Sequence, residues 1–395
     1  MKNFAFYIFA VLLIIVIGSP VISYAAEIAD QGQFFVPDDP LKGIRVFEQK
    51  GCIKCHSVLG EGAYVGPDLS KKLFYGDFFD LGSVMWNHSP DMSRMMNEMM
   101  HPRPTFTVKE IQELFIFLHY LKYLGEPGDP VAGKKLFTEK GCATCHSSGK
   151  SAPKIEDLSH QAAPIKLAQA MWNHGPKMDA QMKSLGMNRP RFEGEEITHL
   201  AAYLNSLNGG DPNERKLVKP GNPKTGKQVF ENKGCADCHT VLSAGNGKDT
   251  GLADKLTHKS VTEIAGIMWN HGPKMWKELG KESARVSFED DEMADIIAFL
   301  YLAGFMNVTG QKEKGEEVFR EKSCYICHDK SAGETFVVDL KKTNKINTPE
   351  EMIQMMWNHA SGMEMMMNDM NIPWPNFEKT EMKDLYIFIK SIQTE

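Results

Sequence analysis

The stretch Gly-Cys-Ile-Lys-Cys-His at residues 51–56 decides the architecture, because it ends in a Cys-x-x-Cys-His pentapeptide that the chain repeats. The four copies use all 8 cysteines of the 395-residue chain. Their first cysteines lie about 90 residues apart, at Cys52, Cys142, Cys235 and Cys324. A recurrence over this distance is too long for a solenoid unit and indicates a small complete domain. We therefore predict four similar domains in tandem.

Other residues recur in register with the pentapeptides. Nine residues before each first cysteine is a glycine, and five residues before it is a phenylalanine: Gly43 and Phe47, Gly133 and Phe137, Gly226 and Phe230, Gly315 and Phe319. Farther along, each repeat carries Met-Trp-Asn-His and then another methionine. Each repeat closes with apolar residues at spacings of three and four, which is typical of the buried face of a helix.

We expect an all-α fold from these recurring residues. A first helix leads into the pentapeptide, a second helix bears the tryptophan, a loop carries the later methionine, and a final helix closes the repeat. Linkers rich in Gly, Pro and Asp separate the repeats. The predicted domains cover residues 33–125, 128–208, 221–305 and 310–395.

Residues 1–25 resemble a signal peptide. Lys2 precedes an apolar run at residues 4–17, and Ser23-Tyr24-Ala25 offers small residues before a cleavage site. The run is about 14 residues, shorter than the about 20 that span a bilayer. We therefore favour cleavage, with an uncleaved membrane anchor as the alternative. Either outcome predicts a periplasmic or otherwise extracytoplasmic protein, soluble or anchored by its N-terminal segment.

The pentapeptide itself predicts covalent haem. Two cysteines separated by two residues form thioethers with the haem vinyl groups, and the adjacent histidine binds one face of the iron. A zinc site would need a second ligand pair nearby, and a disulfide framework would need cysteines elsewhere. We expect four covalently attached haem c groups, held by Cys52, Cys55, Cys142, Cys145, Cys235, Cys238, Cys324 and Cys327, with His56, His146, His239 and His328 as proximal ligands.

The sixth ligand of each iron decides between electron transfer and catalysis, because an open iron can bind a small molecule. The favoured candidates are the methionines six residues after each tryptophan: Met92, Met178, Met275 and Met363. In two repeats this methionine follows Gly-Pro, which predicts a turn out of the helix. Two alternatives stay open. One is an open site, and the other is the histidine of Met-Trp-Asn-His: His88, His174, His271 or His359.

The tryptophan of Met-Trp-Asn-His also has two roles open. A large aromatic ring in a small domain is usually buried in the core. Its indole N–H can in addition donate to a haem propionate. The two roles are compatible, and the sequence favours neither.

With both axial ligands placed, each repeat resembles a class I cytochrome c domain. The whole is similar to a tetrahaem c-type cytochrome with a variant Met-Trp-Asn-His…Met ligand region. The resemblance implies that the glycine and phenylalanine of the first helix cross the last helix. It also implies that a proline carbonyl accepts a hydrogen bond from the proximal histidine, a role that Pro67 fits fully and Pro153 partly. Repeats three and four lack this proline, and Ser323 replaces the glycine found before the first cysteine elsewhere.

The predicted function is electron transfer through four haems outside the cytoplasmic membrane, between a redox protein donor and an acceptor. A net charge of −6, from 45 basic and 51 acidic residues, gives no footprint for nucleic acid. The chain shows no other catalytic motif, so we expect a carrier and not an enzyme. Two alternatives remain: a haem redox enzyme with one open iron, and a cytochrome subunit of a membrane respiratory complex.

Overall fold

The structure is a computed structural model. It describes residues 34–71, 76–123, 128–149, 152–157, 163–207, 220–242, 251–279, 287–329, 338–343 and 346–394. The chain divides into two units, Met1–Phe34 and Phe35–Glu395, and every element below belongs to the second. The expected signal peptide at residues 1–25 lies outside the described residues.

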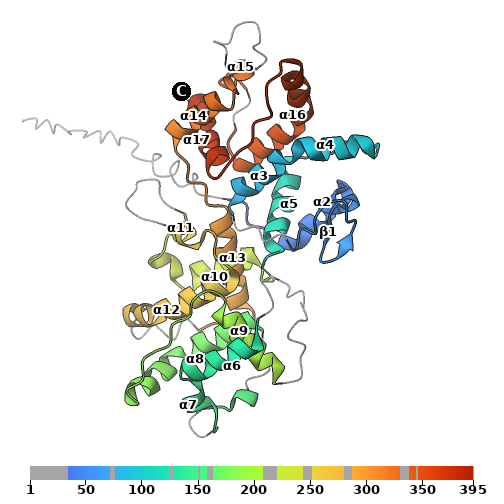
Figure 1. Cartoon of the computed structure of the whole chain (residues 1–395). Helices are drawn as coiled ribbons and strands as arrows, with labels where there is room; N and C mark the ends of the chain where they lie inside the picture. The colour runs from blue at the N-terminus through green and yellow to red at the C-terminus, as the bar shows by residue number, and fades with distance from the viewer. Residues whose placement is uncertain are drawn as a thin grey trace, which may run out of the picture. The chain divides into compact units, whose positions relative to one another are not determined.

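The expectation of an all-α fold is confirmed, because helices make up nearly all regular structure of the described residues (Figure 1). The described part holds a single small sheet, in which β1 (Ser57–Val58) pairs antiparallel with β2 (Glu61–Gly62). Repeat 1 also contains η2 (Pro40–Lys42), α2 (Gly43–Gln49), η3 (Cys52–Lys54), α3 (Phe78–Asn87), α4 (Ser89–Glu98) and α5 (Val108–Tyr120). Repeat 2 contains α6 (Pro130–Glu139), α7 (Cys142–His146), α8 (Pro164–Ser184) and α9 (Glu196–Ser206).

The later repeats follow the same order of elements. Repeat 3 contains α10 (Pro223–Asn232), η5 (Cys235–Asp237), α11 (Leu252–Leu256), α12 (Val261–Leu279) and α13 (Glu292–Phe305). Repeat 4 contains α14 (Lys312–Glu321), α15 (Tyr325–His328), α16 (Pro349–Asp369) and α17 (Glu381–Thr394).

The first and last helices of every repeat cross at the glycine, as the resemblance implies. A Cβ atom at Gly43 would overlap the backbone carbonyl of Glu113, so only glycine lets the two backbones come this close. Gly133, Gly226 and Gly315 meet His199, Asp295 and Asp384 in the same way. The phenylalanine one turn later packs on an aromatic ring of the last helix, in the pairs Phe47–Phe117, Phe137–Tyr203, Phe230–Phe299 and Phe319–Phe388.

A repeated ion pair fixes the chain just before each pentapeptide. Lys50, two residues before Cys52, binds Glu110 at 2.9 Å in the first turn of the last helix. The other repeats have the same pair at 2.8–3.0 Å: Lys140–Glu196, Lys233–Glu292 and Lys322–Glu381. Each lysine side chain is only 17–22% exposed. The pair therefore ties the start of the pentapeptide to the final helix.

The later methionines lie in helices, so the predicted methionine loop is wrong. Helix α8 continues through Pro176 and helix α12 through Pro273, so Gly-Pro does not end either one. In repeat 1 the helix breaks only briefly, because α4 begins at Ser89 directly after α3 and His88. A proline inside a helix leaves the carbonyl four residues earlier without its usual N–H donor.

Two of these carbonyls accept hydrogen bonds from another repeat. The carbonyl of Trp269, four residues before Pro273, accepts from Arg189 at 3.5 Å. The carbonyl of Trp86 accepts from the indole of Trp374 at 3.3 Å. In α12 the bond from Arg189 offsets the lost intrahelical bond, which explains why this helix tolerates Pro273.

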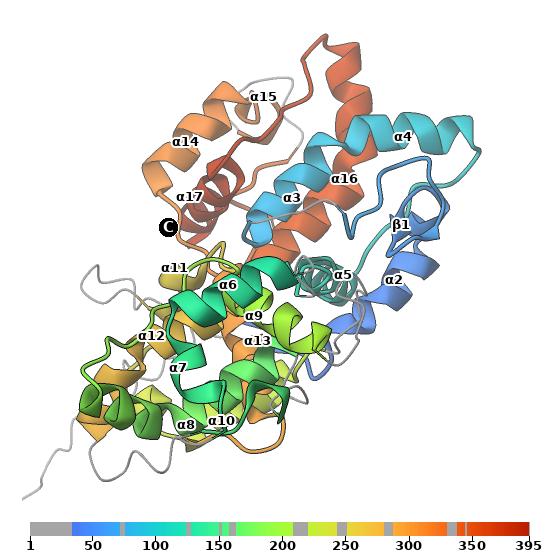
Figure 2. The same ribbon diagram turned by 60° about the horizontal axis from the view of Figure 1, so that its bottom comes forward.

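Repeats pack in pairs that do not follow the order of the chain. Helices α16 and α17 of repeat 4 lie against α3 of repeat 1, and α12 of repeat 3 lies against α8 and α9 of repeat 2. Both ribbon views show these neighbours side by side (Figures 1 and 2). Repeat 1 therefore pairs with repeat 4, and repeat 2 with repeat 3.

The last helices of repeats 1 and 3 meet in a buried aromatic cluster. His119 on α5 stacks between Tyr301 and Phe305 of α13, with ring centroids 4.1 Å away on each side. The hydroxyl of Tyr120 donates to the carbonyl of Ala298 at 2.6 Å. This cluster joins the two pairs of repeats through side chains that water does not reach.

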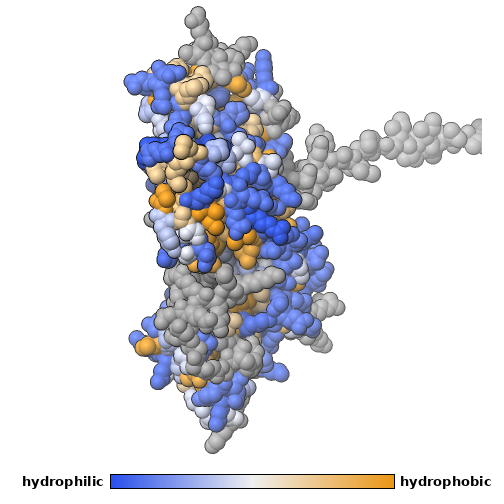
Figure 3. Space-filling view, turned by 90° about the vertical axis from the view of Figure 1, so that its right-hand side faces the viewer, coloured by the Kyte–Doolittle hydropathy of each residue, from blue (hydrophilic) through white to orange (hydrophobic). Residues whose placement is uncertain are grey.

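The outer surface is mostly polar on the face that Figure 3 shows, with an apolar cluster near its middle. Within the described residues, no helix combines the length and the apolar character needed to cross a bilayer.

Ser323 gives a direct test of the backbone at the pentapeptide. The residue before the first cysteine is left-handed in every repeat, with φ of 80° at Gly51, 79° at Gly141, 73° at Gly234 and 63° at Ser323. A side chain in this conformation costs about 1 kcal/mol. We predict that Ser323→Gly raises the free energy of unfolding by about 1 kcal/mol in urea titrations. The reverse change, Gly234→Ser, should lower it by a similar amount, and equal stabilities would contradict the assignment.

His119 predicts a specific acid sensitivity. Burial lowers its pKa to about 3, so the folded protein keeps it neutral where the unfolded chain would protonate it. The stability contributed by the neutral ring is complete above about pH 6.5 and is lost as the pH falls toward 3. Between pH 7 and about pH 4.5 the wild type should lose about 2 kcal/mol more stability than His119→Phe. Identical acid dependence of both proteins in urea titrations would refute this role.

Candidate haem sites

Each pentapeptide begins directly after the left-handed residue and forms a short turn of helix. Burial raises the pKa of Cys52, Cys142 and Cys235 to about 11 and that of Cys324 to about 12. Such thiols are protonated at neutral pH, which disfavours a thiolate used for redox exchange. The eight cysteines are all free of disulfides. The first cysteine of each pentapeptide is partly buried, which is compatible with a thioether bond to an apolar macrocycle.

Three of the proximal histidines are oriented by backbone carbonyls. The Nδ1–H group of His56 donates to Pro67 O at 3.1 Å, and that of His146 to Pro153 O at 2.9 Å. This confirms the role that the resemblance assigned to the two prolines. In repeat 4, His328 Nδ1 donates to Val338 O at 3.3 Å, so a different residue supplies the carbonyl. Each bond leaves Nε2 available for a metal, as metal-binding histidines require.

Each histidine of Met-Trp-Asn-His shares one helix face with the later methionine. His88 lies four residues before Met92, and the other repeats keep this spacing, so both candidate sixth ligands point to the same side of the helix. The histidines of three repeats donate Nδ1–H to the carbonyl four residues earlier: His88 to Val84, His174 to Ala170 and His359 to Met355. Their Nε2 atoms are thereby directed away from the helix.

In repeat 3 the imidazole rings of the two histidines lie close together. The imidazole centroids of His239 and His271 are 6.1 Å apart, and the rings are inclined at 64°. Burial lowers the pKa of both groups, and Lys255 lowers each further. In repeat 4, burial lowers the pKa of His328, and the neighbouring His359 adds to that effect. All these shifts favour the neutral imidazole that binds metals.

The surroundings of these histidines fit a haem. Val84 and Ile267 lie one turn before His88 and His271 on the same helix face, and they are 47% and 41% exposed. These are apolar surfaces that a macrocycle would cover. Nearby, Nε of Arg103 and of Arg189 is buried without a hydrogen-bond partner among the described residues. A buried guanidinium with a free N–H is suited to a propionate. Once bound, haem c would supply an iron that changes oxidation state by one electron.

The asparagine of Met-Trp-Asn-His joins the paired repeats. The Asn87 side chain donates to Phe377 O and accepts from Phe377 N, both at 2.8 Å. Asn358 binds Phe106 in return, with both distances 2.9 Å. In the other pair, Asn173 binds Phe288 and Asn270 binds Phe192 at 2.7–3.0 Å. We call this reciprocal contact the asparagine clamp.

The tryptophan reinforces the clamp. It is buried in every repeat, which agrees with a core role. Three of the indoles donate Nε1–H to a carbonyl of the paired repeat at 2.8 Å: Trp86 to Pro375, Trp269 to Pro190 and Trp357 to Pro104. In these repeats the N–H group is thus used for docking and is not directed to a propionate.

The residue before each of these prolines covers the ring of the partner tryptophan. The guanidinium of Arg189 lies 3.4 Å from the ring centre of Trp269, and that of Arg103 lies 3.8 Å from Trp357. In the remaining case Trp374 stacks on Trp86 at 4.4 Å. These arginines and Trp374 are functional positions that the sequence reasoning missed. The signal that could have found them is their fixed place, three residues before the phenylalanine of each clamp.

Polar contacts outside the clamp differ between the two pairs. Lys383 of repeat 4 forms a buried ion pair with Asp77 of repeat 1. In the other pair, the carboxylate of Glu195 accepts from Ser260 at 2.7 Å and from Thr262 at 2.6 Å. All repeats share the asparagine clamp, so the clamp cannot select which repeats pair. The contacts that differ between the two pairs favour pairing of repeat 1 with repeat 4 and of repeat 2 with repeat 3.

Comparisons with known proteins agree with this geometry. A family model for cytochrome c matches residues 41–122, 130–208 and 223–301. A nitric oxide reductase subunit of Halomonas halodenitrificans is 32% identical over 84 residues, which are 20% of this chain and 55% of that protein. The chain thus spans about half the length of this curated relative. No solved structure matches the chain.

The clamp predicts a cost for removing one asparagine pair. Asn173→Ala with Asn270→Ala removes four hydrogen bonds and leaves the backbone groups of Phe288 and Phe192 without these partners. We expect a loss of about 2–4 kcal/mol in the free energy of unfolding by urea. The exposed Asn97 on α4 provides the control, because Asn97→Ala should change stability by less than about 0.5 kcal/mol. A double variant as stable as this control would refute the clamp.

Proposed function

Since the chain belongs to the cytochrome c family, we propose that it is a tetrahaem electron-transfer protein that acts outside the cytoplasmic membrane. The family implies covalently bound haem c and electron transfer. We propose in addition the number of haems, the location of the protein and its partners.

The observation that supports the proposal is that the same set of structural features surrounds the pentapeptide in all four repeats. Each repeat has the glycine crossing, the lysine–glutamate pair, the left-handed residue and the pentapeptide in the same order. Repeat 4 lies beyond the stretches that the family model matches, yet it shares all of these features. His328 and His359 also lie near each other there. This supports a fourth haem on Cys324 and Cys327.

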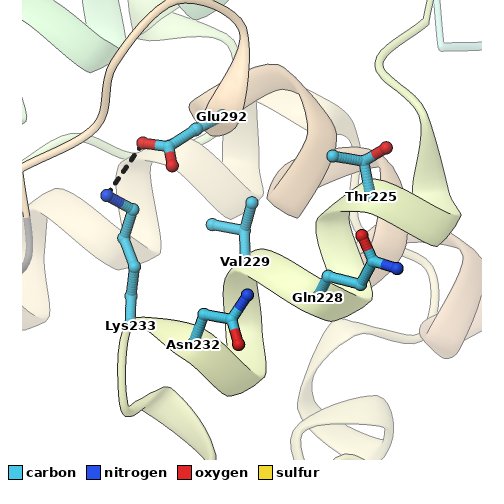
Figure 4. A pocket seen from close by; sticks show the side chains of 6 residues that line it. All are labelled: Thr225, Gln228, Val229, Asn232, Lys233 and Glu292. Atoms are coloured by element: carbon cyan, nitrogen blue, oxygen red, sulfur yellow. Dashed lines mark ion pairs between the residues drawn. The ribbon is translucent and has the colours of Figure 1, made fainter.

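A carrier is favoured over an enzyme because every repeat keeps its candidate sixth ligands. A saturated iron passes electrons, whereas catalysis needs an open position. A hollow beside α10 is lined by Thr225, Gln228, Val229, Asn232, Lys233 and Glu292 (Figure 4). Its only charged groups are Lys233 and Glu292, which pair with each other. This hollow therefore presents no unpaired charged side chain to a substrate.

The paired packing supports electron exchange within each pair. Hydrogen bonds hold repeat 1 to repeat 4 and repeat 2 to repeat 3, and the cluster at His119 joins repeats 1 and 3. We propose redox proteins as donor and acceptor. The likeness to part of a nitric oxide reductase favours one specific form of this idea, a cytochrome subunit of a membrane respiratory complex. The N-terminal segment, whether cleaved or kept as an anchor, would direct the protein to the outer side of the membrane.

A spectroelectrochemical titration tests the proposed carrier function. The purified protein should take up four electrons reversibly, with the haem bands changing at every step, and the reduced form should bind no carbon monoxide. Cys324→Ala with Cys327→Ala should reduce the uptake to three electrons. Carbon monoxide binding by the wild type would support the enzyme alternative and contradict a pure carrier.

A further inference from the structure

We infer that His271 is the sixth ligand of the haem iron in repeat 3, in place of Met275, and that repeat 2 holds this histidine in position. The inference rests on the proposed function, because it requires a haem on Cys235 and Cys238. It narrows that function by assigning a bis-histidine iron.

The distance between the two rings is the first argument. A metal–imidazole bond is about 2 Å long, so two imidazoles on opposite sides of one iron have ring centroids about 6 Å apart. The centroids of His239 and His271 are 6.1 Å apart. The inclination of 64° excludes face-to-face stacking as the reason for their approach.

The position of the helix is the second argument. The sequence predicts Met275 in a loop, but the residue lies one turn after His271 along the same helix, α12. A helix rises 1.5 Å per residue, so four residues separate the two candidates by about 6 Å along the axis. The helix face that brings His271 to His239 therefore carries Met275 past that point.

The paired repeat supplies the third argument. Asn270, directly before His271, exchanges two hydrogen bonds with the backbone of Phe192 in repeat 2. Trp269 donates to Pro190 O, and its own carbonyl accepts from Arg189. These bonds fix the helix turn that presents His271. Asn270 is thus a positioning residue that acts through His271.

The other repeats share parts of this arrangement. His88, His174 and His359 stand at the same place in the motif, and each has its Nδ1–H bound to a carbonyl of its own helix. The tautomer is thereby set so that Nε2 is the metal-binding atom.

The test compares two holoprotein variants, His271→Ala and Met275→Leu, by carbon monoxide binding to the reduced form and by near-infrared magnetic circular dichroism of the oxidised form. His271→Ala should bind about one carbon monoxide per chain and lose one bis-histidine signal, because an alanine leaves the iron open. Met275→Leu should match the wild type in both measurements. Carbon monoxide binding by Met275→Leu, or none by His271→Ala, would overturn the assignment.

The haem content separates failure of this inference from failure of the proposed function. Both variants should keep four haems per chain by absorbance of the denatured protein, because neither change touches a cysteine. Fewer haems in the wild type would count against the proposed function. Four haems with a methionine signal in repeat 3 would count against His271 alone.

A third variant tests the positioning role. Asn270→Ala should bind carbon monoxide at a fraction of one site per chain, between the wild type and His271→Ala. Asn97→Ala serves as the matched control and should bind none. An Asn270→Ala protein that is destabilised but keeps its bis-histidine signal would show that the asparagine stabilises the pairing without positioning the ligand.

Discussion

The close crossing of the first and last helices is the contact on which the rest of each repeat depends. At Gly43 the two backbones approach so closely that any side chain would strike the carbonyl of Glu113. The first helix then ends at a left-handed residue, and the pentapeptide starts at a fixed place relative to the final helix. The ion pair between Lys50 and Glu110 holds that place from the other side. A small domain can thus position two cysteines and a histidine with few residues. A covalently bound macrocycle would add apolar surface to a core that is small in a domain of this size.

The repeats are incomplete without one another. Each second helix places its tryptophan and asparagine in the partner repeat, and the partner returns the same contacts, as in an isologous dimer interface. The exchange also accounts for the proline in helix α12, since the carbonyl that Pro273 leaves free is bound by Arg189 of the other repeat. The same contacts therefore pair the repeats, keep the helix continuous and hold the histidine of Met-Trp-Asn-His in place. A substitution in the asparagine clamp should therefore change how the iron is ligated.

The sequence predicted the features that are local to one repeat. The glycine crossing, the phenylalanine contact and the carbonyl partners of His56 and His146 are all present. Each depends on spacings within about 90 residues that self-alignment makes visible. Even the departure at Ser323 appears in the structure, as a strained version of a glycine position.

The features that the sequence did not predict join distant parts of the chain. The asparagine recurs in all four repeats, but its partner phenylalanine can be 290 residues away, and nothing in one sequence links the two. Gly-Pro was interpreted as a turn because proline usually ends a helix. The compensating donor, Arg189, comes from another repeat and could not be anticipated. Local patterns thus gave the haem motifs and the helices, while tertiary contacts decided where the candidate sixth ligands lie.

The most direct test of the account is the intact mass of the mature protein under denaturing conditions, where only covalently attached groups remain. Four haems in addition to the polypeptide mass are predicted, with the fourth on Cys324 and Cys327. A mass corresponding to three haems or fewer would contradict the account. The structural features that the four repeats share would then not be sufficient for haem attachment.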